Sequence, residues 1–267
     1  AQLVKTDVAG DRQGVDFIFA AQSLSPNESI VVVRNSSAFQ SRFGNGPRLA
    51  LGEDGLGGNW GEYDGGLDNG GERITLLDAT GVVIQQFDYD DSADWPGRAD
   101  GNGSSLEVVD TAGDYSDPDN WQSSIDFGGS PGAIGSTPAT DVLISEVLAH
   151  TDPPLKDTIE LVNTTNTDID VSGWYLSDSS RNFFKFSLPP VTTLPANGYL
   201  VFDEDDFNPG VGTQPTDFSL SSFGDDVWLW SVDTGGRPDK LIDHVEFSAT
   251  LTDVSIGRLP TTDASSD

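Results

Sequence analysis

The sequence predicts an all-β protein that consists of two tandem β-sandwiches. Short apolar runs recur along the whole chain, and turns rich in its 30 Gly and 15 Pro residues separate them. No apolar stretch keeps the helical period over several turns, whereas alternation of apolar and polar residues is typical of half-buried strands. Segments of the first half also recur in the second half in the same order, which favours two copies of one module.

The domain boundaries follow from a stretch of small residues in the middle of the chain. Residues 128–140 are mainly Gly, Ser, Thr and Ala with two prolines, a composition that predicts a semi-flexible linker. The first domain is then expected at residues 1–127 and the second at residues 141–267.

The first domain is expected to contain short strands rich in β-branched and aromatic residues. One helical turn is expected at Ser37–Phe43, a Gly- and acid-rich loop at residues 52–66, and a polar turn that ends at Trp121. The expected strands are Val15–Ala20, Ser29–Arg34, Arg73–Asp78, Val82–Tyr89 and Ser104–Asp110, of which the third and fourth form a hairpin.

In the second domain, Asp170–Asp178 is expected to anchor the core, because Trp174 is the largest side chain available there. About eight short strands suit a sandwich of the immunoglobulin type. They are expected at Val142–Ala149, Thr158–Asn163, Ile169–Leu176, Phe183–Ser187, Gly198–Asp203, Asp226–Val232, Lys240–Phe247 and Val254–Leu259.

Three pairs of segments carry the internal repeat, and they keep their apolar positions while their polar ones vary. Ile74 matches Val227, so both are expected to point inward. Thr75 matches Trp228, so Trp228 is expected to point outward unless a neighbouring element covers it. The pairs are Leu24–Val32 with Leu194–Phe202, Leu67–Leu76 with Leu220–Leu229, and Val83–Tyr89 with Leu241–Phe247.

The first domain has no evident counterpart of the opening strands of the second. Residues 142–181 precede the strand at Phe183, but only Ala1–Gly14 precede the strand at Val15. A sandwich without these strands exposes backbone groups at its edges. We expect the chain to be a piece of a longer protein that supplies the missing strands. The alternative is that another chain supplies them by β-augmentation, as in a strand-complemented filament.

The charge balance excludes one class of partner. The chain has 44 acidic and 13 basic residues and a net charge of −31, so we do not expect it to bind nucleic acid, whose phosphates require Lys and Arg. The acids are dispersed in turns, which indicates a solvated surface suited to a saline environment. No apolar run is long enough for membrane insertion.

Acidic loops could hold Ca²⁺, which prefers oxygen ligands. Of the three such loops, those at residues 88–94 and 110–120 are preferred over Asp203–Asp206. None has the spacing of an EF-hand, and the alternative is that the side chains cap turns of their own backbone. No other cofactor is expected. The candidate calcium ligands are Asp90, Asp91 and Asp94 in one loop and Asp114, Asp117 and Asp119 in the other.

Three aromatic residues are candidates for contacts with a carbohydrate or a protein partner, namely Trp60, Tyr63 and Trp228. Exposed rings stack on sugars or mark a protein interface. No catalytic site is expected, because the two histidines, His150 and His244, lie in different parts of the predicted fold and no Cys accompanies them.

A set of short motifs lies along each domain. The motifs are Ile144–Val147, Ile159–Asn163, Val171–Asp178, Leu194–Val201 and Ser255–Arg258 in the second domain, and Leu67–Ile74, Trp95–Arg98, Ser104–Glu107 and Asp117–Trp121 in the first. They resemble the lamin tail domain in its bacterial, secreted form. The first domain lacks the opening segments of this family, so the resemblance is to two tandem copies, the first without its N-terminal strands.

The resemblance implies an immunoglobulin-like sandwich, and it brings no catalytic residue with it. Such modules resemble accessory parts of large surface or secreted proteins. We therefore expect a non-catalytic role in adhesion, assembly or display on an exported bacterial protein, with protein partners or self-assembly. The alternatives are carbohydrate-binding modules of a larger secreted hydrolase and an extracellular filament subunit assembled by strand complementation.

Overall fold

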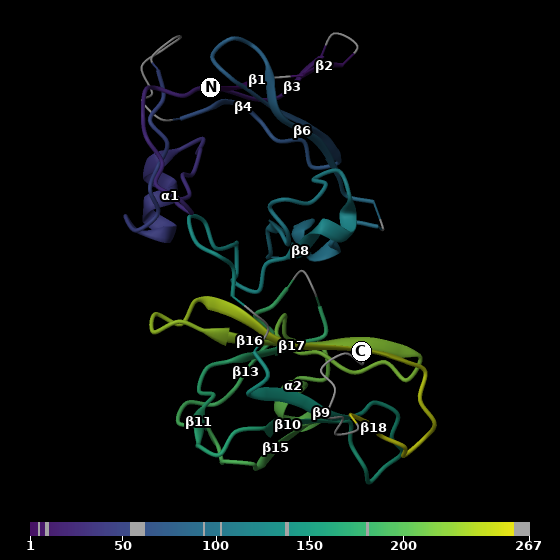
Figure 1. The fold of residues 1–267 in the computed structure, drawn as a ribbon. Helices are drawn as coiled ribbons and strands as arrows, with labels where there is room; N and C mark the ends of the chain where they lie inside the picture. Colours follow the sequence, from purple (N-terminus) through teal and green to yellow (C-terminus); the bar gives the residue numbers. More distant parts are fainter. Residues whose placement is uncertain are drawn as a thin grey trace. The chain divides into compact units, whose positions relative to one another are not determined.

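The computed structural model describes residues 1–258 apart from residues 5, 9–10, 54–61, 93, 102, 137–138 and 180–181. Most of the regular secondary structure in the described chain is antiparallel strand (Figure 1), which confirms the all-β prediction. It divides into two compact units. Unit 1 comprises Ala1–Ser124 and Gly128–Ser136, and unit 2 comprises Ile125–Phe127 and Thr137–Asp267. Among the described residues, no helix has the length and apolar character needed to cross a membrane.

Unit 1 is organised around one antiparallel sheet of strand order β2-β3-β1-β5-β6, with β4 paired to β3. β7 and β8 form a separate two-stranded sheet. Helix α1 begins after Asn35, whose side chain accepts a hydrogen bond from the Ala38 amide. The elements are β1 Gln2–Val4, β2 Thr6–Val8, β3 Asp11–Ile18, α1 Ser36–Phe43, β4 Asp64–Gly66, β5 Gly71–Leu77, β6 Val83–Asp90, β7 Leu106–Val108 and β8 Trp121–Ser123, with short 3-10 helices at Gly97–Ala99 and Pro118–Asn120.

Unit 2 contains two four-stranded antiparallel sheets, ordered β15-β10-β9-β18 and β13-β12-β16-β17. Both sheets contribute to one apolar core, in which Leu161 and Leu229 are fully buried. This is the arrangement of an immunoglobulin-like sandwich. Trp174 packs against that core while only partly buried. The elements are β9 Val142–Leu148, β10 Thr158–Asn163, β11 Ile169–Asp170, β12 Tyr175–Ser177, β13 Phe186–Ser187, β14 Thr193–Leu194, β15 Tyr199–Asp203, α2 Glu204–Phe207, β16 Gly224–Val232, β17 Pro238–Ser248 and β18 Ile256–Gly257.

A second apolar cluster covers the outer face of β16. Trp228 packs there with Trp230 and Phe183 and is only 6% exposed. Its ring stacks on that of His244, with 3.7 Å between the ring centroids. The expectation that Trp228 offers an exposed ring is therefore wrong, because neighbouring aromatic side chains cover this face as well.

The hairpins β5–β6 and β16–β17 have the same geometry. Ile74 pairs with Phe87 in unit 1 as Val227 pairs with Val245 in unit 2. Both ladders shift register at the same place, after Leu76 and after the matching Leu229. The turns before them also agree, because the Asp68 amide donates to Glu72 as the Ser221 amide donates to Asp225.

The strands that lie beside the two hairpins, β1 in unit 1 and β12 in unit 2, also correspond to each other. Leu3 of β1 pairs with Leu76, and Leu176 of β12 pairs with the matching Leu229. On the other side, Leu3 pairs with Phe17 of β3 as Leu176 pairs with Phe186 of β13. The expectation that unit 1 lacks any counterpart of Asp170–Asp178 is therefore corrected, since β1 occupies that place in the sheet.

The middle of the chain differs from the semi-flexible linker expected at residues 128–140. The Gly128 amide donates to Gly103 O at 2.6 Å and Ser130 Oγ donates to Glu107 at 2.5 Å, so residues 128–136 pack within unit 1. The preceding residues Ile125–Phe127 instead extend the sheet of unit 2, where the Leu241 amide donates to Ile125 O at 3.0 Å.

Candidate binding pocket

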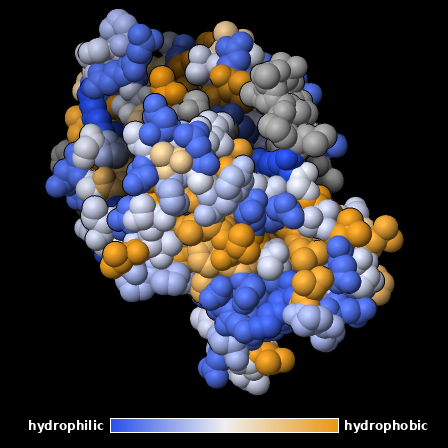
Figure 2. All heavy atoms as spheres, turned by 90° about the horizontal axis from the view of Figure 1, so that it is seen from below, coloured by the Kyte–Doolittle hydropathy of each residue, from blue (hydrophilic) through white to orange (hydrophobic). Residues whose placement is uncertain are grey.

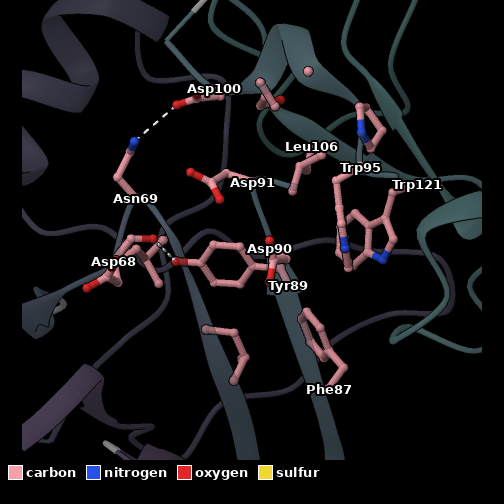
Figure 3. Close-up of a pocket in the computed structure, with 16 residues that line it drawn as sticks. Asp68, Asn69, Phe87, Tyr89, Asp90, Asp91, Trp95, Asp100, Leu106 and Trp121 are labelled. Carbon is pink, nitrogen blue, oxygen red and sulfur yellow. Dashed lines mark hydrogen bonds between the residues drawn. The ribbon is translucent and has the colours of Figure 1, made fainter. Parts of the chain in front are cut away.

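Unit 1 contains a pocket of about 440 Å³ above the inward face of β5 and β6 (Figure 3). This volume lies in the range of ligand-binding sites. The turn before β5 and segments that follow β6 in the sequence form the other walls. The lining residues are Leu67, Asp68, Asn69, Ile74, Phe87, Tyr89, Asp90, Asp91, Trp95, Pro96, Gly97, Ala99, Asp100, Ser105, Leu106 and Trp121.

Aromatic side chains from three segments line one side of this pocket. The ring centroids of Phe87 and Trp121 are 5.5 Å apart, and those of Trp95 and Trp121 are 6.0 Å apart. Trp121 is held in place because its Nε1–H donates to Tyr115 O at 2.9 Å. All three pocket rings remain partly accessible, so they offer apolar surface to a bound group.

Tyr89 supplies the fixed polar group of the pocket. Its hydroxyl donates to Asp68 O at 2.5 Å and lies 3.3 Å from Glu72 Oε1. Burial, and after it the negative charge of Glu72, raise the pKa of Tyr89 well above its ordinary value. The phenol therefore stays protonated at neutral pH and keeps tying the β6 strand to the turn before β5.

Carboxylates form the rim, and three of them are held by bonds within the chain. Asp68 accepts from the Gly70 amide at 2.8 Å and Asp90 from the Ser92 amide at 2.7 Å. Asp100 accepts from Asn69 Nδ2 at 3.0 Å, a bond visible in Figure 3. Asp91 has no hydrogen-bond partner within the described parts of the chain. The rim thus favours a neutral or cationic group over an anion.

The predicted calcium ligands do not converge. Within the residues that the structure describes, no group of three or more His, Asp or Glu side chains is placed to hold a metal ion. Asp114 accepts from the Ser116 amide and Asp117 from the Asp119 amide, so these carboxylates cap turns. Asp90 and Asp91 lie at the pocket rim, and Asp94 lies in the turn that follows.

The predicted aromatic contacts are not brought together either. Trp60 lies outside the described residues, and Trp228 is buried. Tyr63 is partly buried and its amide donates to Val33 O at 2.8 Å. The pocket rings Phe87, Trp95 and Trp121 were not predicted as a site. The available signal was a Trp in a turn, Trp95, and a Trp that ends a polar turn, Trp121, both of which follow the inward-facing Phe87 in the sequence.

The histidines show no arrangement for nucleophilic catalysis. His150 Nδ1 lies 3.0 Å from Thr250 O, and its Nε2 lies 3.3 Å from Thr252 Oγ1. His244 Nε2 lies 2.8 Å from Asp226, while its ring stacks on Trp228. Neither ring is placed between a carboxylate and a nucleophilic hydroxyl among the described contacts.

Comparison with known protein families finds a match in the second half of the chain. No curated protein matches the chain. The model of the Lamin Tail Domain family matches residues 135–248, which lie in unit 2 apart from the first two. The facing sheets of unit 2 agree with the immunoglobulin-like fold of that family. The second half of the chain, over residues 135–248, is thus similar to the lamin tail domain.

Proposed function

We propose that the chain is a non-catalytic interaction protein in which unit 2 is a rigid module and unit 1 binds the partner. One observation carries this proposal, namely the preformed pocket of about 440 Å³ in unit 1. The partly accessible rings of Phe87, Trp95 and Trp121 line one side of it and offer apolar surface to a partner.

The broader setting of this role is an exported bacterial surface or extracellular protein that serves adhesion, assembly or display in a saline environment. The net charge of −31 supports the saline setting in this proposal. The shared hairpin geometry of the two units supports two tandem lamin-tail-like modules.

Binding of the neutral apolar dye Nile red tests whether the pocket accepts a ligand in solution. We expect saturable dye fluorescence that Trp95→Ala weakens by at least about tenfold, because the ring forms one wall. Tyr199→Ala is the matched control, since this aromatic side chain is 59% exposed in unit 2. Dye fluorescence that is absent, or equal in both variants, would refute a binding role for the pocket.

A carbohydrate ligand is the second candidate, and the combination of Trp95, Trp121 and Asn69 in one pocket favours it. Aromatic faces stack on sugar rings, amide groups donate hydrogen bonds to hydroxyls or accept them, and carboxylates accept hydrogen bonds from hydroxyls. Glycan-array binding that disappears in Trp95→Ala would support this candidate, and the absence of any bound glycan would remove it.

A further inference from the structure

Strand β15 lies at an open edge of unit 2. It is the outer strand in the sheet order β15-β10-β9-β18, so only β10 pairs with it among the described strands. The outer strands β13 and β18 comprise two residues each, whereas β15 comprises the five residues Tyr199–Asp203. Part of the outer edge of β17 is covered, because Ile125–Phe127 pairs with it. β15 therefore offers an uncovered run of backbone at the side of a sheet.

The free backbone groups of β15 belong to Tyr199 and Val201. At the start of its ladder with β10, the Asn163 amide donates to Gly198 O at 3.0 Å. Because hydrogen-bonded and non-hydrogen-bonded pairs alternate in an antiparallel ladder, the even-numbered residues of β15 bond to β10. Tyr199 and Val201 therefore direct their amides and carbonyls to the outer edge. In the described part of the chain, no group bonds to these four backbone atoms.

The side chains at this edge are apolar and exposed. Tyr199 is 59% exposed and Val201 is 55% exposed. Tyr199 lies opposite Val162 of β10, which lies opposite Leu143 of β9, and the latter two side chains are partly exposed. A row of apolar side chains thus crosses the sheet and reaches its open edge. Lys, Pro and inward-pointing charges usually protect such edges from other strands, and none of them occurs at residues 199–201.

Carboxylates accompany this apolar row. On the same face, Glu160 lies opposite Val201 and Glu146 lies opposite Glu160. Asp203 ends the strand, and helix α2 follows it with three further acidic residues, one of which pairs with a lysine. Opposite charges favour association, whereas like charges oppose it. The edge therefore favours a basic partner over a second copy of this chain, whose net charge is −31.

We infer that the open edge of β15 is a docking site for an extended basic segment of a partner protein, which adds to the sheet as a new outer strand. The segment forms hydrogen bonds with the backbone of Tyr199 and Val201. Its side chains on the outer face are apolar next to these two residues and basic next to Asp203. This docking site lies in unit 2 and is separate from the pocket of unit 1.

The synthetic peptide acetyl-Lys-Arg-Thr-Val-Thr-Val-Thr-amide tests the inference on the full chain. In an antiparallel arrangement its valines lie opposite Val201 and Tyr199 and its arginine lies opposite Asp203. We expect saturable binding in an NMR titration. At saturation the amides of Tyr199 and Val201 should exchange at least about fivefold more slowly, because they gain partners. The amides of Leu200 and Phe202 already face β10 and should change little.

Two N-methylated peptides test whether the backbone carries the interaction. Methylation of both valine amides removes the donors that face β15, so this peptide should bind at least about tenfold more weakly. The control peptide is methylated at the first two threonines, whose amides point away from β15 in the same arrangement. It should bind as tightly as the unmethylated peptide.

Two matched variants of the chain locate the docking site. Val201→Lys places at the edge a charge that repels the basic peptide, so we expect binding at least about tenfold weaker. Val191→Lys changes the net charge equally at a loop position of unit 2 that is 92% exposed, and it should leave binding intact. Both positions lie outside the pocket, so both variants should still bind Nile red, and Trp95→Ala should still bind the peptide.

The outcomes are distinct. Peptide binding that Val201→Lys and valine methylation both weaken, together with slower exchange at Tyr199 and Val201, supports the inference. Absent binding, unchanged exchange at these two amides, or equal binding by Val201→Lys and Val191→Lys overturns it. A dimer of the chain that Val201→Lys dissociates in sedimentation also overturns it, because the occupant is then a second copy. Nile red binding decides separately about the pocket.

Discussion

Gly71 and its counterpart Gly224 hold positions that only glycine fits. Their φ angles are 104° and 116°. A Cβ atom at Gly71 would lie 2.4 Å from Tyr89 O, and one at Gly224 would lie 2.8 Å from Phe247 O. Each glycine therefore satisfies two requirements, a left-handed backbone and the close approach of the neighbouring strand.

Gly71→Ala should lower the free energy of unfolding of unit 1 by more than about 2 kcal/mol, because backbone strain and a steric conflict act together. Gly81→Ala is the control. Its φ is 87° but no atom lies within 4 Å of the added Cβ, so it should cost only about 1 kcal/mol. Urea denaturation of both variants measures the difference. Equal losses would show that the contact with Tyr89 O is relieved at no cost.

Asp243 links β17 to β9. Its Oδ2 accepts from the Ile144 amide at 2.7 Å, and its Oδ1 accepts from Arg258 at 2.9 Å. Burial raises the pKa of Asp243 above its ordinary value of 3.8, while the Ile144 amide and Arg258 oppose the rise. The folded chain therefore binds this proton more tightly than the unfolded chain does.

This raised pKa fixes the sign of a pH effect. The contribution of Asp243 to stability is present at low pH and is lost as the pH rises through its folded-state pKa. Protonation of Asp243 should therefore raise the free energy of unfolding of unit 2 as the pH falls from about 7 to about 4. We expect this rise to be smaller in Asp243→Asn. Urea denaturation over this range measures it, with Asp239→Asn at an exposed position of the same strand as the control. Parallel profiles of Asp243→Asn and the unsubstituted chain would contradict the assignment.

At the scale of the element, β6 and β17 provide a matched comparison. Ile242→Ala should cost about 2–4 kcal/mol in unit 2, because its side chain is 9% exposed in a packed core. Ile84→Ala should cost less than about 1 kcal/mol in unit 1, because its side chain is already in contact with solvent. Chemical denaturation of both variants checks this. A loss in unit 1 as large as that in unit 2 would mean that Ile84 is covered in solution.

The acidic turn at residues 110–120 provides the test of calcium binding. Asp117 accepts from the Asp119 amide at 3.1 Å and caps the short 3-10 helix. Asp117→Ala should therefore cost about 1 kcal/mol whether or not calcium is present. The measurement is thermal unfolding in Ca²⁺ and in EDTA. A melting temperature that falls in EDTA for the unsubstituted chain, but not for Asp117→Ala, would instead indicate a calcium site in this loop.

The alternation of apolar and polar residues was sufficient to predict strands that pair with the next strand in the sequence. Strands were predicted at Arg73–Asp78 and Val82–Tyr89, and the hairpin β5–β6 is found there. Strand β1 was missed because three residues carry no periodicity, and its stability comes from pairing with β3 and β5. The pocket was missed for a similar reason, since Phe87, Trp95 and Trp121 meet only in the folded unit.

At the scale of the whole molecule, repulsion among acidic side chains affects stability. With 13 basic residues, the chain can pair only a minority of its 44 acidic residues. Some of the described ion pairs are solvent-exposed, for example Arg73–Asp88 with side chains 46% and 55% exposed, and exposed pairs contribute little to stability. The surface in Figure 2 shows hydrophilic side chains around groups of apolar ones. Unbalanced negative charge on this surface opposes the compact state.

Salt should therefore stabilise the chain. The distance over which charges act falls from about 30 Å at 0.01 M salt to about 3 Å at 1 M, so repulsion among the carboxylates is largely removed over this range. We expect the melting temperatures of both units to rise by several degrees between these concentrations, which corresponds to roughly 1–2 kcal/mol. Differential scanning calorimetry in NaCl measures it. A sucrose series serves as the control, because sucrose stabilises folded chains without screening charge. Melting temperatures that stay constant or fall with NaCl would show that the net charge of −31 does not limit the stability of this protein.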